Sequence, residues 1–214
     1  MSFKNLNLIN PIVRAATEAG CAKPSELQND IIPQILNGRD ILCCMSNDME
    51  RLTSFIMPII QLLKKNNTDH NETRVLILTS TKESALRIEE NFKVYTKYLP
   101  LAQLSVYDGI SNGTQLSSLR KRLDLIIATP DKLLELDEQR HITLSKIEML
   151  VVDEADELLE SNSGTFIKLI HKLPIKRQNI FYSSTISKDL TIFAERTLNN
   201  RLEINKKDYF SAVS

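Results

Sequence analysis

The chain has 214 residues, 42% of them hydrophobic, which suits one large folded domain and excludes a disordered chain. Its 27 basic and 27 acidic residues give no net charge, so nucleic-acid binding would have to come from a local patch and not from the chain as a whole. No run of about 18 apolar residues occurs and the N-terminus lacks a signal-peptide pattern, so we expect no membrane contact and a cytoplasmic location.

Short runs of β-branched and apolar residues predict seven strands, at 40–45, 74–79, 103–107, 124–128, 148–152, 179–183 and 201–205. Helical patterns follow four of them, at 52–65, 82–99, 131–139 and 165–173. Several strands are apolar throughout, which is typical of strands buried on both faces. Strands that alternate with helices favour right-handed crossovers and a mostly parallel sheet. The sequence therefore predicts one three-layer α/β domain with helices on both faces of the sheet.

Polar residues at the strand ends are candidates for a site, because ligands of such sheets bind beyond the carboxyl ends of the strands. The loops in question follow residues 45, 79, 128, 152 and 183. In the fourth of them, the run VVDEAD delivers Asp153 and Glu154 at the end of a hydrophobic strand. Two adjacent carboxylates there could hold a hydrated Mg²⁺ and orient a water molecule, and an ordinary acidic loop is the alternative.

The cysteine and histidine residues predict no metal site. Cys43 and Cys44 are adjacent within an apolar run, which favours buried thiols over metal ligands. The three histidines are scattered without a ligand spacing and are assigned no role.

Five further segments surround the DEAD sequence at 153–156 in a fixed order. They are GCAKPSELQ at 20–28, LTSTKE at 78–83, YDG at 107–109, ATPDKLLE at 128–135 and YSSTIS at 182–187. With these segments the chain resembles the DEAD-box RNA helicases, bacterial members in particular, and specifically their N-terminal RecA-like domain. The resemblance implies a single RecA-like domain of the P-loop NTPase type at 1–206 and a tail at 207–214, with the second helicase domain absent.

The resemblance weakens at the phosphate-binding loop, the Walker A motif. The family carries A-x-T-G-x-G-K-T after its first strand. An ungapped alignment places six residues of this chain at the T-G-x-G-K-T positions: Asn47, Asp48, Met49, Glu50, Arg51 and Leu52.

Four of these replacements oppose triphosphate binding. Asp48 and Glu50 replace glycines, whose dihedral freedom curls backbone N–H groups around phosphates, and their carboxylates would face phosphate charge. Like charges about 4 Å apart repel by roughly 4 kcal/mol at an effective dielectric near 20. Arg51 replaces a lysine with a wider, planar head, and Leu52 replaces the hydroxyl that would ligate Mg²⁺.

We therefore expect no productive ATP binding and no cofactor. Without a bound anion, Asp48 or Glu50 would favour the positive end of the following helix. Arg51 would then be available to pair with Asp153 or Glu154, so that an internal ion pair occupies the vacant phosphate position.

The other sites that the resemblance implies are also altered. Gln28 would read adenine, and a place in a helix-capping turn is the alternative for it. RNA phosphates would be held by Thr81, Lys82, Gly109, Thr129 and Lys132, in which both lysines replace bidentate arginines. Asp131, where the family has a glycine, is also explained as a helix cap. Ser183 and Thr185 would couple nucleotide state to RNA.

Three functions remain open from the sequence. The first is a degenerate DEAD-box domain, a pseudo-helicase that binds RNA weakly or a protein partner without hydrolysing ATP. The second is the N-terminal domain of an ATP-dependent RNA helicase, with Asp153 and Glu154 catalytic and Mg-ATP as cofactor, working with a second domain in trans. The third is a relic that folds and binds nothing.

Overall fold

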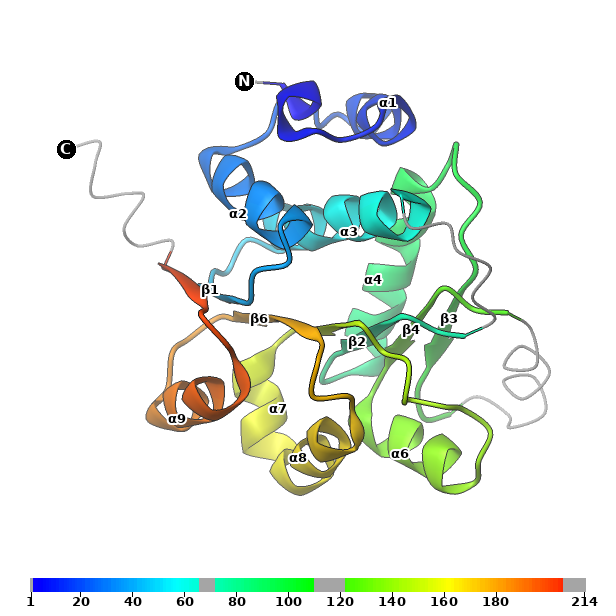
Figure 1. Ribbon diagram of the computed structural model, residues 1–214, viewed down its shortest axis with the longest axis vertical. Helices are drawn as coiled ribbons and strands as arrows, with labels where there is room; N and C mark the ends of the chain where they lie inside the picture. Colours follow the sequence, from blue (N-terminus) through cyan, green and yellow to red (C-terminus); the bar gives the residue numbers. More distant parts are fainter. Residues whose placement is uncertain (1, 66–71, 110–121, 206–214) are drawn as a thin grey trace.

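The computed structural model describes residues 2–65, 72–109 and 122–205, so the tail expected at 207–214 lies outside the described residues. Seven strands form one sheet in the order β3-β4-β2-β5-β6-β1-β7 (Figure 1). They are β1 (Ile41–Cys44), β2 (Val75–Leu78), β3 (Gln103–Val106), β4 (Leu125–Ala128), β5 (Met149–Val152), β6 (Gln178–Ser183) and β7 (Leu202–Asn205). All seven predicted strands are confirmed, and each of their pairings is parallel.

Helices cover both faces of this sheet, as predicted (Figure 1). One face carries α1 (Asn10–Glu18), α2 (Glu26–Leu36), α3 (Asp48–Lys65) and α4 (Lys82–Tyr95), preceded by the short 3-10 helix η1 (Phe3–Leu6). The other face carries α6 (Pro130–Glu138), α7 (Ala155–Ser161), α8 (Ser163–Lys172) and α9 (Lys188–Thr197). The arrangement is the expected three-layer α/β domain.

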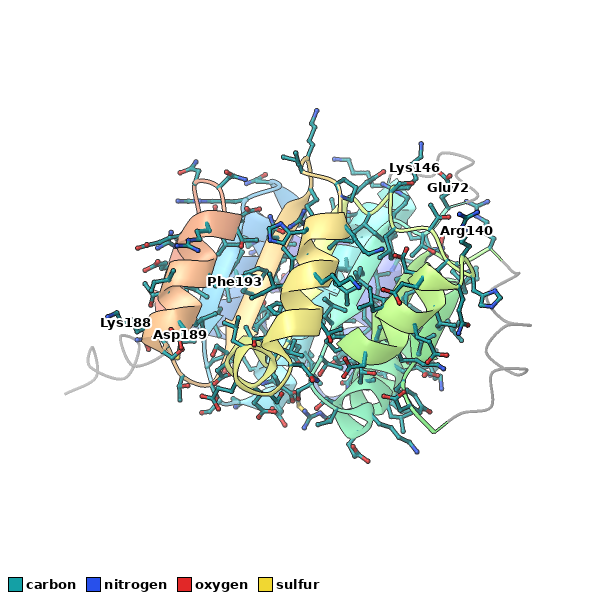
Figure 2. All side chains as sticks on the ribbon, turned by 90° about the horizontal axis from the view of Figure 1, so that it is seen from below. Glu72, Arg140, Lys146, Lys188, Asp189 and Phe193 are labelled. Atoms are coloured by element: carbon teal, nitrogen blue, oxygen red, sulfur yellow. The ribbon has the colours of Figure 1, made fainter. Side chains whose placement is uncertain are left out.

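The two hydrophobic cores explain why the strands are apolar throughout. Along β1, Ile41 and Cys43 pack into the α1–α4 core, whereas Leu42 between them packs into the α6–α9 core. Because successive side chains of a strand point to opposite faces, a strand covered on both sides needs apolar residues at every position. On the second face, Phe193 of α9 points inward, with its ring centroid 5.2 Å from that of Phe166 (Figure 2).

Two details differ from the sequence-based expectations. The helices α1, α2, α7 and α9 were not predicted, and α3 begins at Asp48 and not at residue 52. Of the adjacent thiols expected to be buried, Cys43 is buried but Cys44 is only partly so. None of the helices in the described part of the chain is long and apolar enough to cross a bilayer.

Candidate functional site

The carboxyl ends of the central strands bring the predicted site residues to one edge of the sheet. Since β2, β5, β6 and β1 are consecutive neighbours and parallel, the segments that follow them lie side by side. These segments begin at Met45, Thr79, Asp153 and Ser184. Four of the five strand-end loops in question are thus neighbours at one edge of the sheet.

The first of these segments leads directly into the helix α3. The helix α3 already includes Asp48, Met49 and Glu50 in its first turn. Asn47 precedes it, and its side-chain oxygen accepts a hydrogen bond of 3.1 Å from the backbone N–H of Glu50, as a helix-capping residue does. The two acids lie at the positive end of the helix dipole, where negative charge is stabilising. The positions aligned with the family's phosphate-binding loop, from Asp48 onward, are thus helical in this chain.

Arg51, the next residue of α3, makes the ion pair expected for it. Its side chain is buried, and its Nε lies 3.0 Å from Oδ1 of Asp153. Its Nη2 lies 2.9 Å from Oδ1 of Asp48 and 4.0 Å from Oε1 of Glu154. Neither carboxylate oxygen of Asp153 accepts a hydrogen bond from a described residue, so the contact is an attraction of charges without aligned hydrogen bonds. The guanidinium nevertheless lies against both carboxylates at the end of β5.

A second arginine, Arg87 of α4, contacts two of the same carboxylates from the more exposed side. Its Nη1 lies 2.5 Å from Oδ2 of Asp48, and its Nη2 lies 3.3 Å from Oε1 of Glu154. Asp48 therefore bridges a buried guanidinium and a half-exposed one, and it links α3 to α4. We call Asp48, Arg51, Arg87, Asp153 and Glu154 the ion cluster. Three carboxylates in it face two guanidinium groups.

Asp153 is the most deeply placed member of the ion cluster, with a fully buried side chain. Burial raises the pKa of Asp153 to about 7, although the positive charge of Arg51 works in the opposite direction. Taking a carboxylate out of water is unfavourable unless a cation compensates for it, and here Arg51 is the nearest cation. The state of Asp153 is thus governed by Arg51 and by pH.

Glu154 is held by hydroxyl groups as well as by arginines. It has a left-handed backbone conformation with a φ of 61°, which is uncommon outside glycine. Its carboxylate accepts hydrogen bonds from Oγ1 of Thr79 at 2.9 Å, from Oγ of Ser80 and from Oγ of Ser84 at 2.7 Å. Burial alone would raise the pKa of Glu154, but these hydrogen bonds and the charge of Arg51 outweigh it and lower the pKa. The carboxylate stays ionised with its oxygens occupied.

The last residue of the DEAD sequence, Asp156, anchors the segment after β6. Its Oδ2 accepts hydrogen bonds from Oγ of Ser184 at 2.6 Å, and from the backbone N–H and Oγ1 of Thr185 at 3.0 and 2.9 Å. Ser183, which is buried, donates its hydroxyl to the carbonyl of Thr185. These bonds fasten the β6 end to the start of α7; of the two predicted coupling residues, Thr185 bonds Asp156 and Ser183 bonds Thr185.

The side chain of Gln28 makes hydrogen bonds to other residues of the protein at both its oxygen and its nitrogen. It is the third residue of α2, and its side-chain oxygen accepts the backbone N–H of Ser25 at 3.0 Å in a capping box. Its amide nitrogen donates to Oγ1 of Thr53 on α3 at 2.5 Å. An open cavity of about 550 Å³ lies beside it, lined also by Cys21, Met49 and Glu50. The capping alternative for Gln28 is therefore confirmed.

The residues predicted to hold RNA phosphates are divided between exposed and buried places. Thr81 caps α4, and Lys82 has its ammonium 5.4 Å from the ring centroid of Tyr107. Gly109 is exposed with a φ of 93°. Lys132 is buried and pairs with Glu135 of its own helix at 2.9 Å.

The helix that follows β4 corrects one interpretation. Asp131 does not cap α6, because the N-cap is Thr129 and Asp131 lies inside the first turn. A proline at the first helical position, Pro130, fixes the start one residue earlier than the sequence pattern indicates. The hydroxyl of Thr129 makes no hydrogen bond to a described residue.

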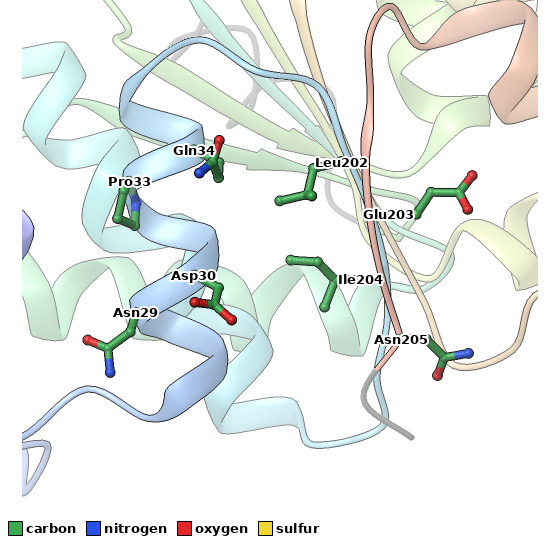
Figure 3. A pocket seen from close by; sticks show the side chains of 8 residues that line it. All are labelled: Asn29, Asp30, Pro33, Gln34, Leu202, Glu203, Ile204 and Asn205. Carbon is green, nitrogen blue, oxygen red and sulfur yellow. The ribbon is translucent and has the colours of Figure 1, made fainter. Parts of the chain in front are cut away.

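A further cavity lies away from these strand ends. It has a volume of about 460 Å³ and is formed between α2 and the edge strand β7 (Figure 3). None of the predicted site residues lines it.

Comparisons with known proteins agree with this arrangement. The DEAD/DEAH box helicase family model matches residues 25–193. Among curated proteins, the probable ATP-dependent RNA helicase ddx27 of Dictyostelium discoideum is 30% identical over 95% of this chain and 26% of its own length. The ATP-dependent RNA helicase dbp10 of Schizosaccharomyces pombe is 31% identical over 96% of this chain and 25% of its length. The ATP-dependent RNA helicase DeaD of Buchnera aphidicola is 30% identical over 95% of this chain and 34% of its length.

A solved structure supports the fold independently. The DEAD box protein from the hyperthermophile Methanococcus jannaschii superposes with a TM-score of 0.88, at 24% identity, over 96% of this chain and 56% of the other. The chain spans about a quarter of the length of the first two curated relatives. Because the family model matches residues 25–193, most of the chain, the chain belongs to the DEAD/DEAH box helicase family.

Proposed function

We propose that this domain is a degenerate member of the family that acts by binding and hydrolyses no ATP of its own. The observation that carries the proposal is the ion cluster, in which Arg51 lies between Asp48 and Asp153 where a phosphate group and its metal would otherwise be held. The partner of such a domain is RNA, held weakly, or another protein.

Mg-ATP fits these residues poorly. The carboxylate of Asp153 is buried behind Arg51, and Leu52 offers no oxygen ligand. The first turn of α3 carries Asp48 and Glu50, so an incoming phosphate would meet two negative charges there. Any nucleotide would have to displace ion pairs already made inside the protein.

Thermal unfolding with and without Mg-ATP tests the proposal. A ligand present at about 100 times its dissociation constant stabilises a protein by about 2.7 kcal/mol. We expect no shift with Mg-ATP, and a clear, saturable shift would contradict the proposal.

Rebuilding the loop tests where the loss lies. The fourfold variant Asp48→Gly, Glu50→Gly, Arg51→Lys and Leu52→Thr restores the family residues, and we expect it to gain nucleotide-dependent stabilisation. Leu52→Thr alone is the matched control, because it adds the hydroxyl while the ion cluster remains. A fourfold variant that folds and still ignores nucleotide would place the loss outside residues 48–52.

A second function is favoured by one specific observation. Ser184 and Thr185 donate hydrogen bonds to Asp156, which links the segment after β6 to the DEAD sequence as a coupling segment requires. Under this alternative the domain binds ATP and RNA together with a second domain in trans. To test this alternative, the second helicase domain of a relative is added to this domain and ATP hydrolysis is measured. The alternative predicts hydrolysis by the mixture and its loss on Glu154→Gln.

RNA binding separates a weak RNA-binding domain from a purely protein-binding one. Weak contacts to phosphates fade steeply with salt, so a single-stranded RNA should be titrated at low salt and again at higher salt. We expect weak binding that Lys82→Ala reduces, because Lys82 is the exposed lysine of the predicted RNA face.

A further inference from the structure

A surface groove lies beside the C-terminal end of α4, and none of its lining residues belongs to the ion cluster. It has a volume of about 620 Å³ and runs between α1 and the segment that follows α4. The helix α4 starts at Lys82, just beyond the carboxyl end of β2, and ends at Tyr95, so Tyr98 beyond it lies near the amino-terminal edge of the sheet. We call this the α1 groove; its lining includes Lys4, Pro11, Val13, Arg14, Glu18 and Tyr98.

One wall of the α1 groove is fixed by a single carboxylate. Glu18 accepts hydrogen bonds from Nε of Arg14 at 3.0 Å, from Nζ of Lys97 at 2.7 Å and from the hydroxyl of Tyr98 at 2.7 Å. The hydrogen bonds from Lys97, Tyr98 and Arg14 lower the pKa of Glu18 to about 2, so it stays ionised. The guanidinium of Arg14 stacks 4.2 Å from the ring centroid of Tyr98. Two cations and an aromatic ring are thus set in place before any ligand arrives, which reduces the ordering cost of binding.

The charge and the apolar surface of this groove indicate the kind of ligand that it suits. Arg14 and Lys97 pair with Glu18, and Lys4 also lines the groove, so three cations stand against one carboxylate here although the whole chain carries no net charge. Pro11 and Val13 are half-buried and add apolar surface beside the ring of Tyr98. A ligand that matches both features carries negative charge next to an apolar side chain.

We propose that the α1 groove binds a short acidic peptide segment of a protein partner, with its carboxylates on Arg14, Lys97 and Lys4 and an apolar side chain against Pro11 and Val13. A peptide fits better than single-stranded RNA, because sequence-tolerant RNA binding depends on bases that stack on exposed rings. Arg14 already covers a face of Tyr98. The fixed negative charge of Glu18 in the middle of the wall also suits discrete carboxylates better than a continuous phosphate chain.

This proposal shares no residue with the ion cluster. Nucleotide binding by the domain would overturn the proposed function and leave the α1 groove untouched. Failure of peptide binding would overturn the α1 groove proposal and leave the ion cluster argument standing. The two are therefore distinguishable on the same protein sample.

The test uses a panel of short synthetic peptides in which Phe or Leu is spaced variously from Asp and Glu. A matched panel has Lys in place of every acid, and a single-stranded RNA is the third probe. Binding to the full chain is measured by fluorescence anisotropy. We expect acidic peptides to bind with an affinity that falls as salt rises, and the lysine panel not to bind.

Variants locate the binding. Arg14→Gln with Lys97→Gln should weaken the acidic peptides by about tenfold or more, and Lys4→Glu should weaken them independently. The side chains of Arg14 and Lys97 are exposed, so the fold should be kept, which far-UV circular dichroism verifies. Lys168→Gln, an equally exposed cation on the other face, is the control and should change nothing.

Three results would overturn the proposal. They are a panel without any acidic binder, acidic and lysine peptides that bind alike, and groove variants that bind as the unaltered protein does. RNA binding that is lost on Arg14→Gln with Lys97→Gln would assign the groove to nucleic acid and would equally contradict it.

Discussion

Replacing Arg51 by methionine tests the ion cluster most directly. Methionine keeps much of the length and apolar volume of the side chain but removes the charge nearest to Asp153. Removing one partner of a buried ion pair typically costs about 3–5 kcal/mol, because the other charge stays buried without compensation. Asp153 has no exposed side-chain surface, so little solvent screening reduces this value. We therefore expect Arg51→Met to lower the free energy of unfolding by up to roughly 3 kcal/mol at alkaline pH, where the folded protein of the unaltered sequence carries Asp153 ionised.

The pH dependence of that loss gives a sharper signature. The pKa of Asp153 in the folded state is about 7, which is above the ordinary value of 3.8. Between pH 3.8 and about pH 7, the folded state therefore binds more protons than the unfolded state. Stability contributed by this group therefore falls as pH rises through that window, by up to about 1.4 kcal/mol per unit. Without Arg51 the folded pKa rises further, and the fall continues to higher pH. The deficit of the variant should consequently be larger at about pH 8.5 than at about pH 6.

Urea unfolding followed by circular dichroism at the two pH values measures both effects. Adding Asp153→Asn to Arg51→Met should recover stability at the higher pH, because the uncompensated charge is then gone. Lys168→Met is the control, since its partner Glu138 and the lysine itself are each more than half exposed, and exposed pairs contribute at most about 1 kcal/mol. A deficit for Arg51→Met that is no larger than this control, or that does not change with pH, would refute the reasoning.

Two further changes probe the neighbouring contacts. Asp156→Ala should cost about 1–3 kcal/mol and speed hydrogen exchange around Ser184 and Thr185, since their donors lose a charged acceptor. Their hydrogen bonds lower the pKa of Asp156 against the opposing effect of burial, so this stabilisation is present at neutral pH and is lost as pH falls through the lowered pKa. An exchange rate unchanged by Asp156→Ala would contradict this. Gln28→Ala should cost about 1 kcal/mol or more, because it removes the capping box of α2 and the bond to Thr53; a denaturation midpoint equal to that of the unaltered protein would show otherwise.

The strands could be predicted because their signal is local. A strand such as β2, buried on both sides, has to be apolar at each position, and its sequence VLIL shows this directly. The helix α2 is not among the predicted elements; Pro33, ordinarily a helix breaker, lies inside it, as Pro58 does inside the predicted helix α3. Packing against the first core evidently outweighs the hydrogen bond that Pro33 cannot make, since Ile31, Ile32 and Ile35 are all buried.

The candidate site was partly predictable for a related reason. The pairing of Arg51 with the strand-end carboxylates follows from charge and topology, since parallel strand ends and the helix after β1 meet at one edge. Arg87 carries no such signal, because it lies mid-helix in a pattern that also suits an exposed charge. The hydrogen bonds from Ser80 and Ser84 to Glu154 could not be predicted, because they depend on the directions of the side chains and not on sequence spacing. The apolar pattern that predicts α3 begins at Leu52, whereas the helix begins at Asp48, because its first turn carries polar residues that give no apolar periodicity.

The bridging position of Asp48 has a consequence for how this domain can change over evolutionary time. A glycine introduced singly at position 48 or 50 would weaken the first turn of α3 by about 0.5–1 kcal/mol and would not yet form a cradle. Threonine alone at position 52 would place a hydroxyl in a site where Leu52 is almost entirely buried. Each reverting step is thus harmful on its own and useful only when the others are present. Under the proposed function, nucleotide binding would therefore return only when several of these positions change together.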